Sequence, residues 1–90
     1  MDMKKTVDMM LSDDYKERFK AEYYQLKERY ERLKIFNTKI EASRRTMYQN
    51  NAVAMPEHDC PEELLMSQQD VMGQYLHILE TRAVIEKIEL

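Results

Sequence analysis

The chain has 90 residues with 14 Lys or Arg and 17 Asp or Glu, so its net charge is −3. This length allows one domain, and a domain so small folds with a narrow margin unless metals, disulfides or oligomerisation help it. Cys60 is the only cysteine, which excludes a disulfide within the chain and is typical of a protein of the reducing cytoplasm. No apolar run approaches the roughly 20 residues of a membrane span, and no apolar segment follows the first five residues, so we expect no membrane partner and no signal peptide.

The residue types favour an all-α fold. Glycine occurs once and proline twice, whereas a sheet protein needs more turn residues. We predict a helical hairpin of two long helices with a short N-terminal helical extension, assembled into an oligomeric helical bundle. The single domain 1–90 divides into the extension 1–11, the first long helix 12–45, the connector 46–60 and the second long helix 61–90.

The N-terminal extension carries Met3, Val7 and Met10 at helical spacing, which indicates a short amphipathic helix or a tail that docks on the domain. The segment 12–14, Ser-Asp-Asp, follows and supplies residue types that cap helix N-termini. Asp14 and Glu17 have the spacing of a capping box, with Asp in place of the usual Ser or Thr. A new helix therefore starts here, or a longer helix bends.

The first long helix has bulky side chains at alternating spacings of four and three residues. This is the heptad pattern of a helix that packs along a partner helix. The row consists of Phe19, Tyr23, Leu26, Tyr30, Leu33, Asn37 and Ile40. Since a 90-residue chain cannot bury this much apolar surface alone, we expect association between copies.

The connector contains Pro56, which discourages continuation of the first long helix. Asp59 or Cys60 is predicted to cap the second long helix, with Pro61 at its first position. Together with His58, these two residues have the chemistry of a nucleophilic or metal site. Adjacent residues seldom converge on one reacting atom, so we favour a capping loop over catalysis or metal binding.

The second long helix contains two adjacent apolar rows at heptad spacing. One row is Leu65, Met72 and Leu79, and the other is Leu64, Val71, Ile78 and Ile85. We predict that the seam is completed by Gln68, Tyr75 and Arg82. Because this stripe is wider than a two-stranded coil requires, it can contact two partners at once. Gly73 permits a close helix approach or is simply tolerated, at a cost of roughly 1 kcal/mol compared with alanine.

Charge is distributed unevenly between the two halves of the chain. Residues 1–45 contain 12 basic and 9 acidic residues, a net charge of +3, whereas residues 46–90 contain 2 and 8, a net charge of −6. The basic excess is too small to indicate duplex DNA binding, so we expect no DNA partner. A small anionic ligand needs only a few well-placed cations.

Tyrosines and cations are interleaved along the first long helix. An aromatic ring stacks on a nucleobase, while Lys or Arg binds a phosphate oxygen. Tyr15 is the strongest candidate, because it lies at a helix start outside the heptad row, where backbone N–H groups favour anions. Tyr23 and Tyr30 are explained more simply as packing residues of that row.

Enzyme motifs are absent from the sequence. It contains no HExxH, GxSxG, Walker loop or GxGxxG. His77 has Gly73 and Thr81 at the i±4 positions, so it lacks a second metal ligand there. We therefore expect a protein that is not an enzyme, with no catalytic residue, no metal and no cofactor.

Two stretches of the chain, roughly 14–36 and 64–85, carry a combination of residues that marks a family. In the first stretch the marks are Asp14-Tyr15-Lys16-Glu17-Arg18-Phe19, Leu26, Arg29, Arg32-Leu33 and Phe36. In the second they are Leu64-Leu65, Gln68, Met72, Tyr75, Ile78-Leu79 and Arg82. With these residues the chain resembles the small phage-encoded cyclic-nucleotide sponges that block CBASS immunity, and it looks most like their short T-even phage member.

The resemblance implies a helical hexamer, arranged as a trimer of dimers, that binds cyclic dinucleotides such as 3′,3′-cyclic GMP-AMP between protomers. Binding removes the messenger in the host cytoplasm without cleaving it, so the CBASS effector stays inactive. A related activity toward cyclic trinucleotides is also implied. Ser67 stands where some relatives carry a basic residue, which weakens the case for that second activity.

The same resemblance implies ligand-binding residues. A tyrosine near the first helix start maps onto Tyr15, and a basic residue roughly four turns later maps onto Lys27 or Arg29. With the clustering of aromatic and basic residues, this predicts a ligand-binding set in which Tyr15 stacks on a base and the cations neutralise phosphates. The set is Tyr15, Lys16, Arg18, Lys27 and Arg29.

Two other functions fit parts of the sequence. A structural or adaptor coiled coil would bind a host protein through its heptad row or through a methionine-rich face. A nucleic-acid-binding accessory protein is less consistent with the acidic second half of the chain.

Overall fold

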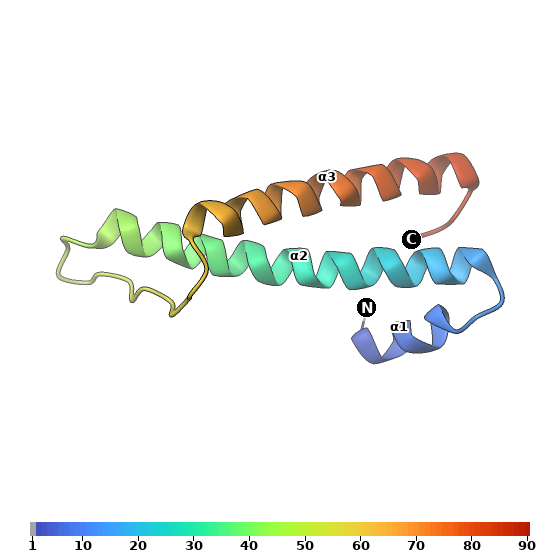
Figure 1. Ribbon diagram of the computed structural model, residues 1–90, viewed down its shortest axis with the longest axis horizontal. Helices are drawn as coiled ribbons and strands as arrows, with labels where there is room; N and C mark the ends of the chain where they lie inside the picture. Colours follow the sequence, from blue (N-terminus) through green and yellow to red (C-terminus); the bar gives the residue numbers. More distant parts are fainter. Residues whose placement is uncertain (1) are drawn as a thin grey trace.

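The computed structural model describes residues 2–90, and within that range it contains three helices and no strand (Figure 1). Helix α1 spans Met3–Met10, α2 spans Tyr15–Thr46 and α3 spans Glu62–Glu86. The all-α class predicted from the sequence is confirmed. The predicted extension 1–11 includes Met1, which lies outside the described residues.

Helix α2 is the central element of the fold. At 1.5 Å per residue its 32 residues span about 48 Å, close to the 54 Å length of the molecule. Helix α3 runs antiparallel along one side of α2, and α1 lies against the opposite side, near the start of α2 (Figure 1). Among the described residues, no helix combines the length and the apolar character needed to cross a membrane.

The start of α2 is defined by the caps that the sequence predicts. The Asp14 side chain accepts the backbone N–H of Lys16 at 2.9 Å, and Ser12 Oγ accepts the backbone N–H of Asp14 at 3.1 Å. These bonds satisfy donors that have no partner inside the helix. A new helix therefore begins at Tyr15, after the three-residue Ser-Asp-Asp turn.

The heptad row of α2 packs along α3, as the spacing predicts. Its members are buried or half-buried, and Phe19, Tyr23 and Ile40 are 5%, 5% and 1% exposed. Phe19 and Tyr23 belong to a core cluster at the end where α2 begins and α3 ends. Farther along, the Asn37 amide nitrogen donates to the Leu65 carbonyl at 3.2 Å and to Gln69 Oε1 at 2.9 Å, so this polar residue also connects the two helices.

The seam of α3 is shifted relative to the prediction. The row that packs on α2 alternates by four and three residues, and we call it the buried row: Leu65, Gln69, Met72, Leu76, Leu79, Ala83 and Glu86. The predicted seam residues Gln68, Tyr75 and Arg82 are instead exposed. Leu76 decides the difference, because it lies between Met72 and Leu79 at heptad spacing and its wholly apolar side chain joins the core cluster in place of Tyr75.

A second heptad row on α3 faces solvent in the single chain. We call it the exposed row: Leu64, Gln68, Val71, Tyr75, Ile78, Arg82 and Ile85. Its aliphatic members are 58%, 62%, 56% and 72% exposed at Leu64, Val71, Ile78 and Ile85. The wide stripe predicted from the sequence therefore divides into one row that packs on α2 and one row whose aliphatic members are exposed. The polar ends of Tyr75 and Arg82 in the exposed row reach back to α2, to Glu22 and to the Phe19 ring.

Helix α3 ends at Glu86, four residues before the predicted end at Leu90. Lys87 adopts a left-handed conformation with φ 58°, which reverses the chain. The backbone N–H of Ile88 then donates to the Ala83 carbonyl at 2.8 Å, and the Ile88 side chain joins the core cluster. This arrangement is a helix C-cap of the Schellman type, and its hydrophobic contact replaces the last turn of the predicted helix.

The extension forms a helix, but its contact face differs from the predicted one. Thr6 is 1% exposed against α2, whereas Val7 and Met10 are about half exposed. Gln25 of α2 donates to Thr6 Oγ1 at 2.9 Å, which satisfies the buried hydroxyl. Ala21 of α2 is fully buried, so a small side chain there is compatible with close approach of α1. The Gln25 amide, which also donates to Met10 Sδ at 2.8 Å, and the small Ala21 therefore hold α1 in place.

The connector is fixed at its end by side-chain contacts. Pro61 itself occupies the cap position of α3 without a side-chain cap bond, so the predicted caps Asp59 and Cys60 are wrong by one or two residues. The His58 ring meets Phe36 edge-on with 5.9 Å between centroids, and its Nδ1 lies 2.7 Å from the Pro56 carbonyl oxygen. The Phe36 contact holds the connector on α2, and the Pro56 contact orients the ring within the connector.

Candidate functional site

The first turn of α2 presents three of the predicted ligand-binding residues. Tyr15 is 47% exposed, Lys16 is half-buried and Arg18 is exposed. The Arg18 guanidinium donates to the Ser12 carbonyl at 2.7 Å, which ties this side chain to the capping turn. The structure therefore brings together an accessible aromatic ring and two cations at one end of the molecule.

Arg82 of α3 lies at the same end, and the sequence did not identify it as a ligand-binding candidate. Its guanidinium carbon is 4.9 Å from the centre of the Phe19 ring, and its Nε donates to Glu86 at 2.8 Å. The hydrogen bond that Arg82 donates to Glu86 raises the pKa of Arg82, and the negative charges of Glu86 and Glu22 act in the same direction. An arginine from the second long helix thus joins the aromatic and basic start of the first.

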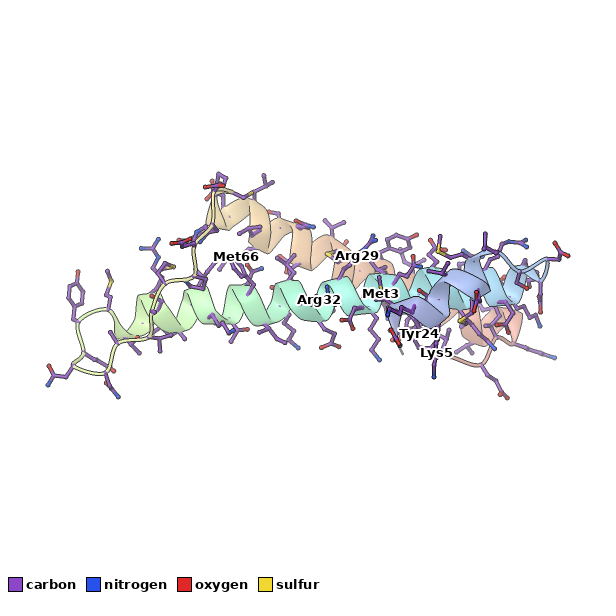
Figure 2. The ribbon with its side chains drawn as sticks, turned by 90° about the horizontal axis from the view of Figure 1, so that it is seen from below. Met3, Lys5, Tyr24, Arg29, Arg32 and Met66 are labelled. Atoms are coloured by element: carbon purple, nitrogen blue, oxygen red, sulfur yellow. The ribbon has the colours of Figure 1, made fainter. Side chains whose placement is uncertain are left out.

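Lys27 and Arg29 occupy a different part of α2. At 1.5 Å per residue they lie about 18 and 21 Å farther along the helix than Tyr15. Figure 2 shows Arg29 near the middle of α2, away from its start. One chain therefore separates the predicted set into two groups, Tyr15, Lys16 and Arg18 in one and Lys27 and Arg29 in the other.

Lys27 is surrounded by tyrosines. Its ammonium nitrogen is 5.9 Å from the centre of the Tyr23 ring, and it lines a hollow of about 240 Å³ together with Tyr23 and Tyr30. Glu31 and Glu80 line the same hollow, so the local charge is mixed. A cation held near aromatic faces has the chemistry to contact a nucleotide phosphate beside a stacked base.

A larger groove of about 570 Å³ continues from this hollow along the flank of α2 and α3. Tyr30 and Gly73 line both spaces, and Gln69, Gln74 and His77 add polar groups. A Cβ on Gly73 would stand 3.5 Å from the Tyr30 ring, which is an ordinary van der Waals contact. Of the two interpretations of Gly73, the structure therefore favours the one in which glycine is tolerated rather than required for close approach.

Tyr23 is a packing residue rather than an accessible ring. Its hydroxyl donates to Glu80 Oε2 at 2.8 Å, which connects α2 to α3. Burial raises the pKa of Tyr23 to about 12, and the hydrogen bond and negative charge of Glu80 act in the same direction. This phenol is therefore protonated and engaged at neutral pH.

The trio His58-Asp59-Cys60 lies in the connector. His58 Nε2 is 3.6 Å from Glu62, whose carboxylate also pairs with Arg44 of α2. The Arg44 hydrogen bond lowers the pKa of Glu62. Cys60 is a half-buried free thiol. Within residues 2–90, no group of three His, Cys, Asp or Glu side chains is arranged to hold a metal ion.

The comparison with protein families gives one decisive result. The family model described as Sequestin matches residues 13–85. The chain belongs to the Sequestin family. The matched range begins within the capping turn of α2 and ends in the last turn of α3, so it contains every predicted ligand-binding residue and both rows of α3 except Glu86, but not α1. Neither the curated proteins nor the solved structures yield a match to this Sequestin chain.

Proposed function

We propose that this Sequestin-family chain binds cyclic dinucleotide messengers, such as 3′,3′-cyclic GMP-AMP, and sequesters them without cleavage. In the cytoplasm of a phage-infected host, this removal would keep CBASS effectors inactive. The observation that carries the proposal is the family match over residues 13–85, since the family's name denotes sequestration and the match includes the aromatic and basic start of α2. The resemblance to the phage sponges, including their short T-even member, agrees with it.

In the proposed site, an aromatic residue stacks on a base and basic residues neutralise the phosphates. Tyr15 presents an accessible ring for a purine, and stacking of this kind contributes about 1–3 kcal/mol per base. Lys16 and Arg18 stand beside it, and Lys27 or Arg29 supplies further positive charge to the phosphates. Because these two groups lie about 18–21 Å apart on one helix, the proposed pocket combines Tyr15 of one copy with Lys27 or Arg29 of another.

The proposed pocket requires a homo-oligomer, and the exposed row of α3 supports one. Leu64, Val71 and Ile78 follow a heptad spacing on an open helix face, which is the pattern of a helix that packs on another helix. A second copy of α3 presents a surface of the same residues and spacing. We propose a hexamer arranged as a trimer of dimers, following the resemblance to the phage sponges.

Enclosure between copies also agrees with the affinity that a sponge needs. Nanomolar binding corresponds to about −12 kcal/mol, and an open surface on a single chain rarely supplies this. Two phosphates and two stacked bases held between subunits can supply it. Binding of cyclic trinucleotides would need a second type of pocket, and Ser67 offers no charge for it.

Isothermal titration of the purified protein with 3′,3′-cyclic GMP-AMP tests the proposal. We expect submicromolar binding by the wild-type protein and a loss of at least tenfold for Tyr15→Ala. Tyr48→Ala is the matched control, because Tyr48 is 95% exposed in the connector and lies outside the proposed site. The absence of heat at micromolar concentrations of protein and ligand would reject the function.

Two further measurements address sequestration and assembly. After heat denaturation of the complex, chromatography should recover the cyclic dinucleotide intact, whereas a linear product would show that the protein is an enzyme. Light scattering coupled to size exclusion should give the mass of an oligomer. A monomer that retains full affinity would contradict the intersubunit pocket.

The exposed row also supports a second candidate function. A heptad face of this kind fits an adaptor that docks on a helix of a host protein. Capture of a host protein through this face, combined with the absence of cyclic dinucleotide binding, would favour the adaptor. Dinucleotide binding by the isolated protein would favour the sponge.

A further inference from the structure

Arg82 is an unusual residue in its half of the chain. Residues 46–90 contain 8 acidic and 2 basic residues, and Arg82 and Lys87 are the basic ones. The fold brings Arg82 to the end of the molecule where α2 begins, against Phe19, which lies about one helical turn after Tyr15. One of two cations in an acidic segment therefore joins the proposed nucleotide site.

The geometry of Arg82 leaves it able to bind a ligand. Its guanidinium lies over the Phe19 ring at 4.9 Å, and a guanidinium stacked on an aromatic ring still directs its N–H donors outward from its edge. Its side chain is 49% exposed, so a ligand can reach those donors. Phe19 in turn is 5% exposed and belongs to the core cluster, so the ring that supports Arg82 is fixed.

Glu86 occupies the donors that a ligand would use. Its carboxylate accepts from Arg82 Nε at 2.8 Å and lies 3.5 Å from Nη2. A phosphodiester has the same paired oxygens as a carboxylate, and arginine binds both in a forked manner. In the free protein, the Glu86 carboxylate thus holds the Arg82 side chain in place. A phosphodiester of a cyclic dinucleotide would present a similar pair of oxygens to the same donors.

We propose that Arg82 binds a phosphodiester of the cyclic dinucleotide whose base stacks on Tyr15, and that Glu86 competes with this phosphate and so limits the affinity. This inference rests on the proposed function and adds a contact from α3 to a site otherwise built from α2. The ligand then bridges both long helices. Glu86 becomes the residue that sets how tightly the site holds its ligand.

Titration calorimetry with 3′,3′-cyclic GMP-AMP on a set of variants tests the inference. Arg82→Gln should weaken binding about tenfold or more, as expected for the loss of a charge-assisted bond. Arg82→Lys keeps the charge without the fork and should fall between the wild type and Arg82→Gln. Glu86→Gln should tighten binding about threefold, because an exposed ion pair that competes with the ligand is weakened.

Arg45→Gln is the matched control for these variants. Arg45 forms the same i,i+4 pair with Glu41, at 3.0 Å, but near the end of α2 that is farthest from Tyr15. Its substitution should change the dissociation constant by less than about twofold, as is usual for exposed pairs of this kind. Binding by the wild type should also weaken more steeply with added NaCl than binding by Arg82→Gln, because one fewer phosphate contact is screened.

The outcomes separate this inference from the proposed function. If the wild-type protein does not bind the dinucleotide, the proposed function fails and this inference fails with it. If the wild type binds and Arg82→Gln binds equally well, or Glu86→Gln weakens binding, only the inference is overturned. Light scattering checks the assembly of each variant. If the Arg82→Gln oligomer dissociates, the Arg82→Lys variant provides the test instead. Unchanged affinity of Arg82→Lys for the dinucleotide overturns the inference, and a loss of threefold or more supports it.

Discussion

The buried and exposed rows of α3 have similar aliphatic residues but different surroundings. Leu79 is 1% exposed and Ile78, its neighbour in sequence, is 56% exposed. The buried row packs on α2 and includes much of the core cluster, whereas the aliphatic side chains of the exposed row are more than half exposed. One helix thus carries one surface that forms the fold and another that is available for association. The apolar content of the helix does not distinguish them.

A charged residue introduced into each row should give the largest effects, on folding for the buried row and on association for the exposed row. Leu79→Asp places a carboxylate in the core and should lower the free energy of unfolding by more than about 4 kcal/mol, enough to unfold a domain of this size. Ile78→Asp should change the fold of the single chain by less than about 0.5 kcal/mol but prevent association. Circular dichroism and light scattering at matched concentration measure the two effects. An Ile78→Asp protein with the wild-type mass would show that the exposed row is not an interface.

The hydrogen bond from the Tyr23 hydroxyl to Glu80, which connects α2 to α3, should be lost at alkaline pH. The pKa of Tyr23 is raised to about 12 from an ordinary value of 10, so its bond to Glu80 is fully stabilising below pH 10 and is lost as the pH rises through 12. Between these values the free energy of unfolding should fall by about 1.4 kcal/mol per pH unit. Denaturant titrations of the wild type and Tyr23→Phe would measure the difference. An equally steep decline in Tyr23→Phe would assign the effect to other groups.

The sequence predicted the α2 row correctly but not the α3 seam. On α2 a single set of bulky residues has heptad spacing, so one face was identifiable. On α3 two adjacent rows are apolar, and the choice between Leu76 and Tyr75 depends on which face meets α2. Periodicity gives the spacing of a seam and not its partner, so the residues Gln68, Tyr75 and Arg82 were assigned to the wrong row.

Only the part of the candidate site whose residues are neighbours in the sequence could be predicted. The capping turn predicted the helix start at which Tyr15 and Arg18 lie. The approach of Arg82 to Phe19 joins residues far apart in the chain, and no spacing rule indicates it. The end of α3 gave no signal either, because Lys87 rather than glycine adopts the left-handed conformation.

Substitution of Lys87, whose backbone is left-handed, should stabilise the packing of the buried row without affecting the exposed row. Lys87→Gly removes the strain of a β-carbon at φ 58° and should raise the free energy of unfolding by about 1 kcal/mol. The turn brings Ile88 into the core cluster, so the gain should disappear when Ile88→Ala is added. Thermal unfolding would measure the gain in stability of Lys87→Gly, with Glu89→Gly as a control outside the turn. A loss of stability in Lys87→Gly would mean that the lysine side chain itself contributes to the cap.

The smallest expected effect concerns Gly73, which belongs to neither row. A Cβ there would meet the Tyr30 ring at 3.5 Å without a clash, and alanine is the better helix former, so Gly73→Ala should stabilise the chain by about 0.5–1 kcal/mol. Chemical denaturation measures the gain, and Gln74→Ala serves as an exposed control on the next position. Since Gly73 lies beside the buried row and away from the exposed row, the mass in light scattering should not change. A destabilised Gly73→Ala protein would show that Tyr30 cannot accommodate the added methyl group, and that the flank groove is shaped by the absence of a side chain at this position.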